Sequence, residues 1–436
     1  MDASLRKILD KVLDVDFGII RFVKEAPLSS DEPEIFIAVT EFQNPFIISS
    51  SDREKYTMER KSAGAALDRE TAIWSAVGEG LERYAGAIYD EDTVIWEKSS
   101  ELVPEAYVHP DDFILFTKEQ YATTDFKYNA HNPKIKVGWT SANSLNNHNE
   151  VLMPASLAYF AYKYEDKSEY LTDSYSTGLA CGPTKEWAIC GGLNEVIERD
   201  AYSLHWAARL SPKKIPLETA IKHSSPELKK LLEFDGVDLF IGDMTTDIGI
   251  PAIITIARQH GKPGIALGAS SNVAPEKALE KAVIECFHTL NWCQEMRHRP
   301  TAIEETEVKQ FADHVKYYLN EENEETASFL WSGNELSTLF EDDATSCVKN
   351  SGHKEQSEYM VNKLFEQGYA SYLVDNTPND IKELGLCVIK AIVPGLQPMW
   401  CGYNRVPLDR RRFESFLTYK GMDANTPINT NIHPFP

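Results

Sequence analysis

The string Glu-x-x-Glu-Arg occurs twice in this 436-residue chain, and both copies lie in long amphipathic stretches. At about 100° per residue, the apolar side chains around each copy gather on one helix face and the charged side chains on the other. We therefore predict two long helices, over residues 68–89 and 184–209, that pack their apolar faces on a core. The charged faces of these helices carry Glu79, Glu82, Arg83, Glu195, Glu198 and Arg199.

A third long helix is predicted over residues 275–297. Pro275 suits the first turn of a helix, and the apolar spacing continues from there to the end of this range. Its polar face carries Lys281 and Glu285, and Ser75 shares the polar face of the first helix. The three helices thus present carboxylates and cations on the sides that face away from their predicted core contacts.

Carboxylates that converge from several helices repel one another unless a cation neutralises them. Mg²⁺ suits this role, because it takes oxygen ligands and usually bridges carboxylates to phosphate oxygens. The flanking Arg83, Arg199 and Lys281 could then contact phosphate directly. An ordinary solvated helix face explains the same charges for any one helix, so periodicity alone allows a metal–phosphate site without requiring one.

Residues 176–184, Ser-Thr-Gly-Leu-Ala-Cys-Gly-Pro-Thr, lead directly into the second helix. Two glycines beside a helix N-terminus can bring backbone N–H groups against an anion, although a tight turn into the helix is an equal alternative. Neither G-x-x-x-x-G-K-[ST] nor G-x-G-x-x-G occurs, so a Walker-type loop and a dinucleotide fingerprint are both absent from the sequence.

The predicted strands, at 34–39, 237–241, 252–257 and 386–393, are mixed with helices without strict alternation. This order favours an α+β fold in which long amphipathic helices pack on mixed or antiparallel sheets. We expect an N-terminal segment over 1–60, a core over 61–300, an acidic helical insertion over 301–350, and a C-terminal part of the core domain over 351–436 that ends in a proline-rich tail.

The composition restricts the possible partners of the chain. There are 67 acidic and 44 basic residues, giving a formal net charge of −23, and the densest basic run is only Arg410–Arg412. A surface of this kind repels nucleic acid and anionic membranes. Seven scattered cysteines without C-x-x-C, no visible secretory signal and no long apolar run lead us to expect a soluble cytoplasmic protein.

The chain resembles the YcaO family over roughly residues 60–300, and more weakly to the C-terminus. The resemblance is carried by Ser75–Arg83, the 176–184 loop, Gly192–Asp200 and Ala278–Glu285, in this order and spacing. It implies an ATP-binding fold without a P-loop, in which glutamates hold Mg²⁺ around the triphosphate. The metal–phosphate glutamates that it implies are Glu79, Glu82, Glu195, Glu198 and Glu285. The cofactor contacts that we expect are Ser75, Arg83, Ser176, Gly178, Ala180, Gly182, Arg199 and Lys281.

Several positions depart from the family pattern. Lys281 stands where arginine is usual, which keeps the charge and loses the bidentate fork. Gly64-Ala65-Ala66 replaces the usual Gly-Lys-Gly, Thr177 replaces an asparagine, and His288 replaces a common glutamine. These changes bear on how the nucleotide base is held, whereas the glutamates are intact.

The ending Asn431-Ile-His-Pro-Phe-Pro436 is similar to that of azoline-forming YcaO members, the cyclodehydratases of thiazole- and oxazole-modified peptides. In those members the C-terminus reaches the active site, so the Pro436 carboxylate or His433 is expected to accept a proton. The resemblance further implies a precursor peptide as substrate, an E1-like leader-binding partner, a flavin dehydrogenase as a further partner, and assembly as a homodimer or hetero-oligomer. The alternatives are an enzyme of this family that forms a thioamide or an amidine, and a catalytically silent nucleotide-binding scaffold.

Overall fold

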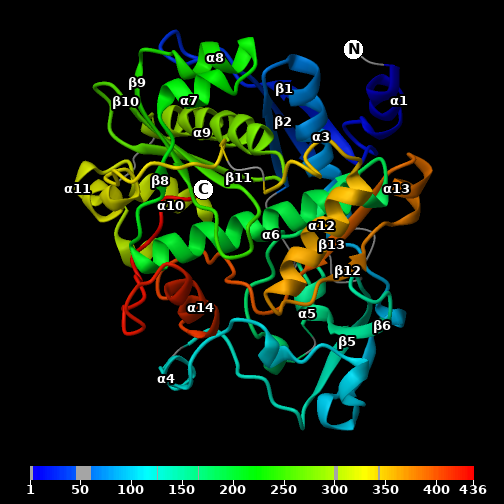
Figure 1. Cartoon of the computed structure of the whole chain (residues 1–436). Coiled ribbons are helices and arrows are strands. Elements are labelled where there is room, and N and C mark those ends of the chain that lie inside the picture. The colour runs from blue at the N-terminus through cyan, green and yellow to red at the C-terminus, as the bar shows by residue number, and fades with distance from the viewer. Residues whose placement is uncertain (1–2, 46–59, 125, 165, 299–302, 342–343) are drawn as a thin grey trace.

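The computed structural model describes residues 3–45, 60–124, 126–164, 166–298, 303–341 and 344–436 (Figure 1). They form an α+β fold with three sheets, in which all pairings between named strands are antiparallel. The predicted fold class is therefore confirmed. Each of the three predicted long helices follows directly on a strand of one of these sheets.

The first sheet has the order β1-β2-β3. Its strands are β1 (Ile20–Glu25), β2 (Phe36–Phe42) and β3 (Lys61–Ala66). Its apolar side chains pack on α1 (Ala3–Val12) and on the first long helix, α3 (Arg69–Gly86). Asp68 caps α3 by accepting the backbone N–H groups of Glu70 and Thr71.

The second sheet has the order β11-β10-β9-β8. Its strands are β8 (Lys213–Lys214), β9 (Val237–Asp243), β10 (Ala252–Gln259) and β11 (Ile265–Ser271). The third long helix, α9 (Pro275–Arg297), covers one face together with the short helices α7 (Leu217–Lys222) and α8 (Pro226–Leu232). The other face packs on the second long helix, so every residue of β11 is buried.

The third sheet has the order β4-β5-β12-β13-β7, with β6 paired to β5. Its strands are β4 (Ile95–Lys98), β5 (Lys136–Ser144), β6 (Glu150–Pro154), β7 (Leu179–Gly182), β12 (Tyr372–Asp375) and β13 (Cys387–Ile392). The short helices α4 (Lys118–Tyr121) and α5 (Ala155–Ala158) lie in the connections around β5 and β6. Periodicity did not indicate β4, β5 and β6, because turn residues and aromatic residues break their pattern.

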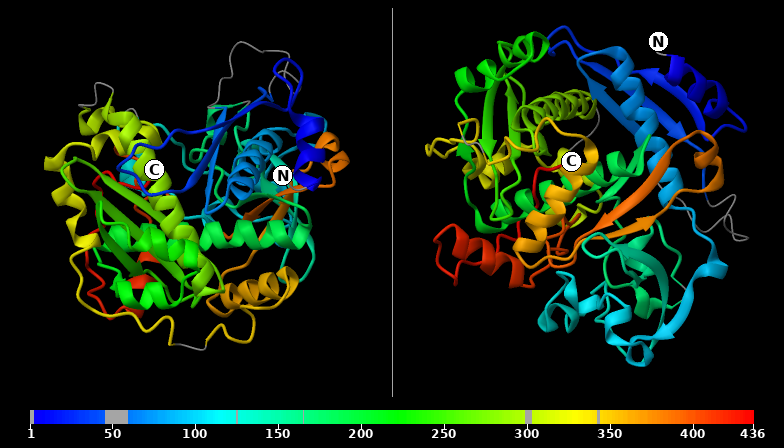
Figure 2. Two further views of the ribbon diagram at one scale, coloured as in Figure 1. Left: turned by 90° about the horizontal axis from the view of Figure 1, so that it is seen from above. Right: turned by 45° about the vertical axis from the view of Figure 1, so that its right-hand side comes forward.

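The second long helix, α6 (Lys185–Ala208), joins two of the sheets. Its first half packs on β7, β13 and α12 (His353–Glu366), and its second half packs on the second sheet. In Figure 2 it runs beneath the two halves of the molecule and spans both. One long helix is therefore shared by two cores, which explains why 17 of its 24 residues are buried.

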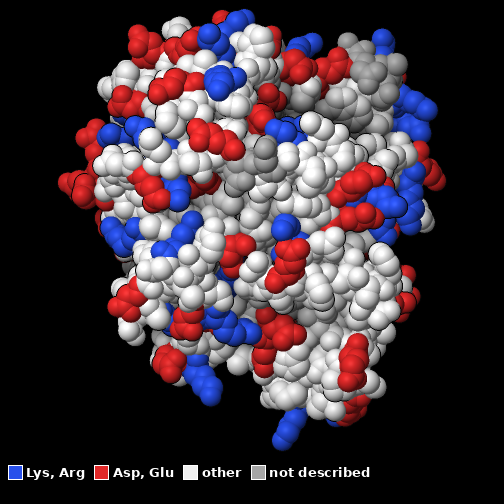
Figure 3. Space-filling view, viewed as in Figure 1, with Lys and Arg blue, Asp and Glu red and all other residues white. Residues whose placement is uncertain are grey.

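The remaining short helices are α10 (Phe311–Tyr317), α11 (Glu321–Glu324), α13 (Asn379–Glu383) and α14 (Arg411–Tyr419). Arg412, from the densest basic run, is buried on α14 and pairs with both Asp200 of α6 and Asp247. Acidic and basic side chains are interspersed on the face seen in Figure 3. Within the described residues, no helix has the length and apolar character needed to cross a bilayer.

Candidate active site

The same local unit occurs three times, once in each sheet, and each copy holds one predicted glutamate. A strand leads into a long helix, and the glutamate that is the eleventh residue of that helix accepts a backbone N–H from the strand or from the turn before it. The pairs are Ala63 N–H to Glu79 at 2.8 Å, Gly178 N–H to Glu195 at 3.0 Å and Ala269 N–H to Glu285 at 3.1 Å. Their sequence separations are 16, 17 and 16 residues.

Two glycines let the strands lie this close to their helices. A Cβ on Gly64 would come within 2.3 Å of the Ala76 backbone nitrogen, and one on Gly268 within 2.2 Å of the Cys286 nitrogen. Any side chain at either position would push the strand away from the helix and withdraw the N–H group from its glutamate. These glycines are therefore part of what positions the carboxylates.

Glu195 lies at the centre of the carboxylate group. Burial raises the pKa values of Glu82 on α3, Glu198 on α6 and Glu285 on α9, and the charge of Glu195 raises each of them further. The charge of Glu79 also raises the pKa of Glu82. All five glutamates predicted from the sequence are thus brought together from three helices.

Three cations lie among these carboxylates. Arg199 Nη2 lies 3.7 Å from Glu195 Oε1 and its Nε lies 3.4 Å from Glu198 Oε1. Arg83 Nη2 pairs with Glu79 Oε1 at 2.6 Å. Burial acts to lower the pKa of Lys281, but Glu198 and Glu285 outweigh it and raise that pKa. The arrangement is a ring of mixed charge with more carboxylates than cations.

This donor set fits Mg²⁺ with a triphosphate. Its carboxylate oxygens are the ligand type that Mg²⁺ prefers, and buried carboxylates with raised pKa values are stabilised in their charged form by a cation. Among the described residues, no three His, Cys, Asp or Glu side chains already stand at metal-binding geometry. Mg²⁺ takes only one or two protein carboxylates when substrate phosphates supply further ligands, so such a preformed cage is not required.

The residues of the predicted anion-binding loop, 176–184, lie at two different places in the structure. The backbone N–H of Gly178 donates a hydrogen bond to the Glu195 carboxylate. The turn from Ser176 to Leu179 is closed by a 2.7 Å hydrogen bond from the Leu179 N–H to the Ser176 carbonyl. Ala180 is buried in β7, and Gly182 lies at the other end of that strand, beside the N-terminus of α6. At 1.5 Å rise per residue that N-terminus lies roughly 15 Å along the helix from Glu195. Gly182 is therefore far from Glu195, but it directly follows Cys181, whose backbone N–H bonds the Glu82 carboxylate. Ser75 lies exposed on α3, one turn before Glu79.

Lys390 on β13 is a site residue that the sequence reasoning missed. Its side chain is 5% exposed, and Nζ donates to the carbonyl of Tyr175 at 2.9 Å. Burial lowers the pKa of Lys390 to about 8, and the charge of Glu195 acts against this shift. The sequence did carry a signal, because Lys390 is a single charged residue inside an otherwise apolar strand. A buried charge of this kind requires a partner.

The C-terminal tail lies against α6. The ring of Phe435 stacks on the Arg199 guanidinium, with 4.3 Å from the guanidinium carbon to the ring centroid. Three backbone carbonyls of the tail accept hydrogen bonds from Trp206, Tyr318 and His314. In Figures 1 and 2 the C-terminus accordingly lies near the middle of the molecule.

His433 is completely buried within this tail. Its Nε2 bonds the carbonyl of Trp400 at 2.7 Å, and burial lowers its pKa well below the usual value. Pro436, by contrast, is only partly buried. These surroundings suit His433 to anchoring the tail, which leaves the Pro436 carboxylate as the better candidate for a proton acceptor.

The chain is similar to known proteins in sequence and in fold. An uncharacterized protein of Methanothermobacter thermautotrophicus is 27% identical over 349 residues, which cover 77% of this chain and 81% of that protein. Among solved structures, YcaO from Methanopyrus kandleri bound with AMPPCP and Mg²⁺ matches with a TM-score of 0.63 at 18% identity, covering 90% of both chains.

Two further structures share the fold. A heterocyclase in complex with substrate and cofactor covers the whole of this chain, with a TM-score of 0.79 at 20% identity. This chain spans 57% of that heterocyclase. The E. coli microcin synthetase McbBCD complex contains a chain that matches with a TM-score of 0.58 at 16% identity, covering 85% of this chain and 87% of that one.

A family model described as YcaO cyclodehydratase, ATP- and Mg²⁺-binding, matches residues 63–397. This range is most of the chain and includes all five glutamates. The chain belongs to the YcaO family.

Proposed function

We propose that this chain is an ATP-dependent cyclodehydratase that converts Cys, Ser or Thr of a ribosomal precursor peptide into thiazoline or oxazoline. The observation that carries this proposal is the contact of Phe435 with Arg199, whose guanidinium also lies beside Glu195 and Glu198. This contact supports the proposal because it holds the proline-rich tail against the helix that carries Glu195 and Glu198.

The site residues divide into two roles in this proposal. Mg²⁺ would be held by glutamates from three helices and would neutralise charge that develops on the phosphates. Arg83, Arg199 and Lys281 would contact the triphosphate from the same helices. Lys390, whose Nζ donates to the carbonyl of Tyr175, would supply a further positive charge near Glu195. Phosphoryl transfer needs mainly positioning and charge stabilisation of this kind.

The reaction requires no nucleophile from the enzyme. The side-chain oxygen or sulfur of the substrate residue attacks the preceding carbonyl carbon, and the Pro436 carboxylate accepts the proton that is released. The new oxyanion attacks the γ-phosphorus of ATP, and ADP leaves. The amide nitrogen then loses its proton and its electron pair expels phosphate, so that a C=N bond closes the azoline ring. The net change is the loss of one water from the peptide for each ATP cleaved.

Assembly with other proteins is part of this proposal. We expect an E1-like partner to bind the leader of the precursor peptide, and a homodimer or hetero-oligomer as the working form. A flavin dehydrogenase would act afterwards if azolines are oxidised to azoles. The microcin synthetase McbBCD complex, which contains a chain of the same fold, supports looking for such an assembly.

Mass spectrometry of the precursor peptide tests the proposal. The chain is incubated with ATP, Mg²⁺ and the peptide, with and without the leader-binding partner, and released phosphate is counted against peptide mass. Loss of one water per phosphate supports cyclodehydration. Exchange of oxygen for sulfur when sulfide is supplied would establish a thioamide-forming enzyme instead. Binding of Mg²⁺-ATP without any peptide-stimulated phosphate release would indicate a silent scaffold.

A further inference from the structure

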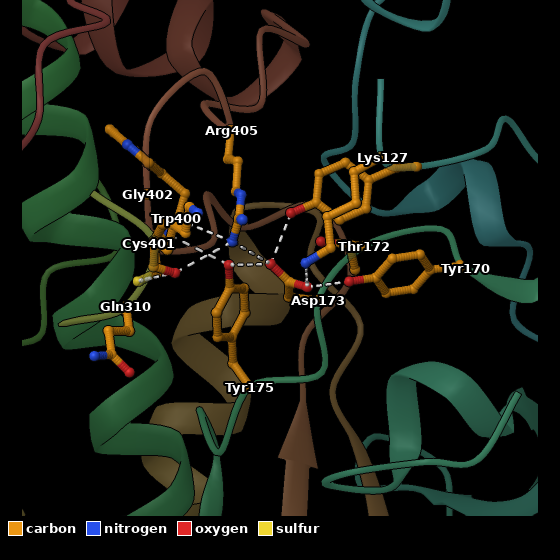
Figure 4. A network of polar contacts seen from close by, with 12 residues as sticks. Lys127, Tyr170, Thr172, Asp173, Tyr175, Gln310, Trp400, Cys401, Gly402 and Arg405 are labelled. Atoms are coloured by element: carbon orange, nitrogen blue, oxygen red, sulfur yellow. Dashed lines mark hydrogen bonds and ion pairs between the residues drawn. The ribbon is translucent and has the colours of Figure 1, made fainter. Parts of the chain in front are cut away.

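A cavity lies near the tail, and none of the five glutamates lines it. It has a volume of about 460 Å³, within the range of ligand pockets. Its walls include the rings of Tyr164, Tyr170 and Tyr175 and the cationic side chains of Lys127, Lys309 and Arg405. Figure 4 shows how several of these side chains gather around one carboxylate, that of Asp173.

Asp173 is fully occupied by groups of the protein itself. It accepts hydrogen bonds from the Tyr128 and Tyr170 hydroxyls and from Lys127, and Arg405 Nη1 lies 3.4 Å from its Oδ2. Burial acts to raise its pKa, but the bonds from Lys127 and Tyr170 outweigh this and keep the pKa below its usual value. Asp173 is therefore a charged anchor that fixes the surrounding rings, and its acceptor capacity is used.

The charge of the cavity is opposite to that of the protein. Three cationic side chains and one carboxylate line it, which leaves a net charge of +2 in a chain of net charge −23. Lys309 is exposed at the rim, and Arg405 reaches across to the carbonyls of Cys401 and Lys309. A local excess of positive charge beside aromatic faces attracts an anionic group that also carries apolar surface.

Backbone conformation at the cavity wall supports a binding role. Ala161, which lines the cavity, has a φ of 57°, a left-handed conformation that costs energy for a residue with a Cβ. Asn404, directly before Arg405, has a φ of 56°. Such conformations concentrate at sites where the fold holds functional groups in place.

One contact connects the cavity to the glutamate site and another connects it to the tail. The carbonyl of Tyr175 accepts the hydrogen bond from Lys390, whose charge interacts with Glu195. The ring of Phe311, another wall residue, lies 6.3 Å from Tyr175 and 6.4 Å from His433 of the tail, measured between ring centroids. One ring thus separates the cavity from the tail.

We propose that this cavity binds a carboxylate-bearing segment of the substrate peptide, next to the residue that is modified. Lys309 and Arg405 would hold the carboxylate, and the tyrosine rings would pack on the adjoining chain. The choice of a peptide as ligand rests on the proposed function. The enzyme would then favour substrates with Asp, Glu or a terminal carboxylate close to the modified residue.

A binding experiment tests this without requiring turnover. The probes are synthetic octapeptides on an array, identical except that Asp and Glu are replaced by Asn and Gln in matched partners. Overall charge alone predicts that a −23 protein binds the acidic member of each pair more weakly. The cavity predicts the reverse, with acidic octapeptides bound roughly tenfold more tightly at low salt and the preference reduced by added salt.

Two variants locate the effect. Lys309→Glu reverses one charge at the rim and should abolish the acidic preference, while Lys230→Glu makes the same change on α8, away from the cavity, and should preserve it. Equal binding of acidic and neutral peptides by the unaltered protein, or an unaltered preference in Lys309→Glu, would overturn the proposal. Acidic preference without any ATP-dependent dehydration would instead count against the proposed function and leave the cavity assignment standing.

Discussion

The ring of Phe435 lies on the guanidinium of Arg199, 4.3 Å from the guanidinium carbon to the ring centroid, and thereby joins the C-terminal tail to the helix that carries Glu195 and Glu198. A cation–π contact of this kind is worth about 0.5–2 kcal/mol. The same contact orients the Arg199 guanidinium and holds the last residues of the chain in place.

Removal of this ring should lower both turnover and stability. We expect Phe435→Ala to lower ATP-dependent peptide turnover at least tenfold, because the tail end and Arg199 both lose their mutual support. Because the Phe435 side chain is fully buried in a hydrophobic core, the variant should also lose about 3–5 kcal/mol in the free energy of unfolding. Trp206 and Tyr318 still hold the tail at Asn431 and Ile432, so the fold should be retained. Phosphate release and thermal unfolding, measured on the same preparation, separate the two effects.

The matched control is Phe365→Ala on α12, where the side chain is 63% exposed. This variant should retain both turnover and stability. Equal turnover in Phe435→Ala and Phe365→Ala would show that the tail end has no part in the reaction.

Lys390 should reveal its burial through the pH dependence of stability. Its pKa is about 8 in the folded chain and near 10.5 when unfolded, so the unfolded state binds more protons between these values. Stability from this group therefore rises with pH across that window, by on the order of 3 kcal/mol in total. Denaturant unfolding of the unaltered protein and of Lys390→Met, at pH 7.5 and pH 10.5, measures the difference.

Lys390→Met removes this titrating group, so its stability relative to the unaltered protein should fall as pH rises. The exposed Lys354→Met on α12 provides the comparison and should show no such trend. A difference between the Lys390 variant and the unaltered protein that is the same at both pH values would contradict the assignment.

Arg412 should be among the most costly residues to replace. It forms a bidentate pair with Asp200, the residue that follows Arg199, and both of their side chains are fully buried. Arg412→Leu leaves that carboxylate unpaired, so we expect a loss of about 3–5 kcal/mol in the free energy of unfolding. Equilibrium denaturation in urea gives this value.

Arg411→Leu, one residue earlier, breaks a pair with Asp409 in which the arginine is 54% exposed. Its cost should be below about 1 kcal/mol. The double variant Asp200→Asn/Arg412→Leu should recover part of the loss, since it removes the stranded charge. Equal costs for the two arginines would be inconsistent with a buried ion pair at Arg412.

The carboxylate helices were predictable because an amphipathic pattern needs only local sequence. Pro275 and Thr184 locate the starts of α9 and α6. The helical period puts the five glutamates on the polar faces of these helices, and the resemblance to the YcaO family singled them out as one set. The position of Gly182 was not predictable, because its distance from Glu195 depends on the direction of β7 beneath the helix. Lys390 was not predicted as a site residue, because strand periodicity does not say which buried strand packs against which helix. The aromatic-rich region around β5 gave no periodic signal, so the Asp173 cavity depends wholly on tertiary packing.

Mg²⁺-ATP binding tests the central claim, that glutamates of three helices form one nucleotide site. Burial raises the pKa values of Glu82, Glu198 and Glu285, so a bound cation should drive their ionisation and release protons. Titration calorimetry at pH 7.5 in two buffers of different ionisation enthalpy counts these protons. The matched variants are Glu198→Gln and Glu186→Gln, the latter exposed on the first turn of the same helix.

We predict that Glu198→Gln binds Mg²⁺-ATP at least tenfold more weakly and releases fewer protons than the unaltered protein, while Glu186→Gln matches the unaltered protein in both. Identical affinity and proton release in Glu198→Gln and the unaltered protein would contradict the account.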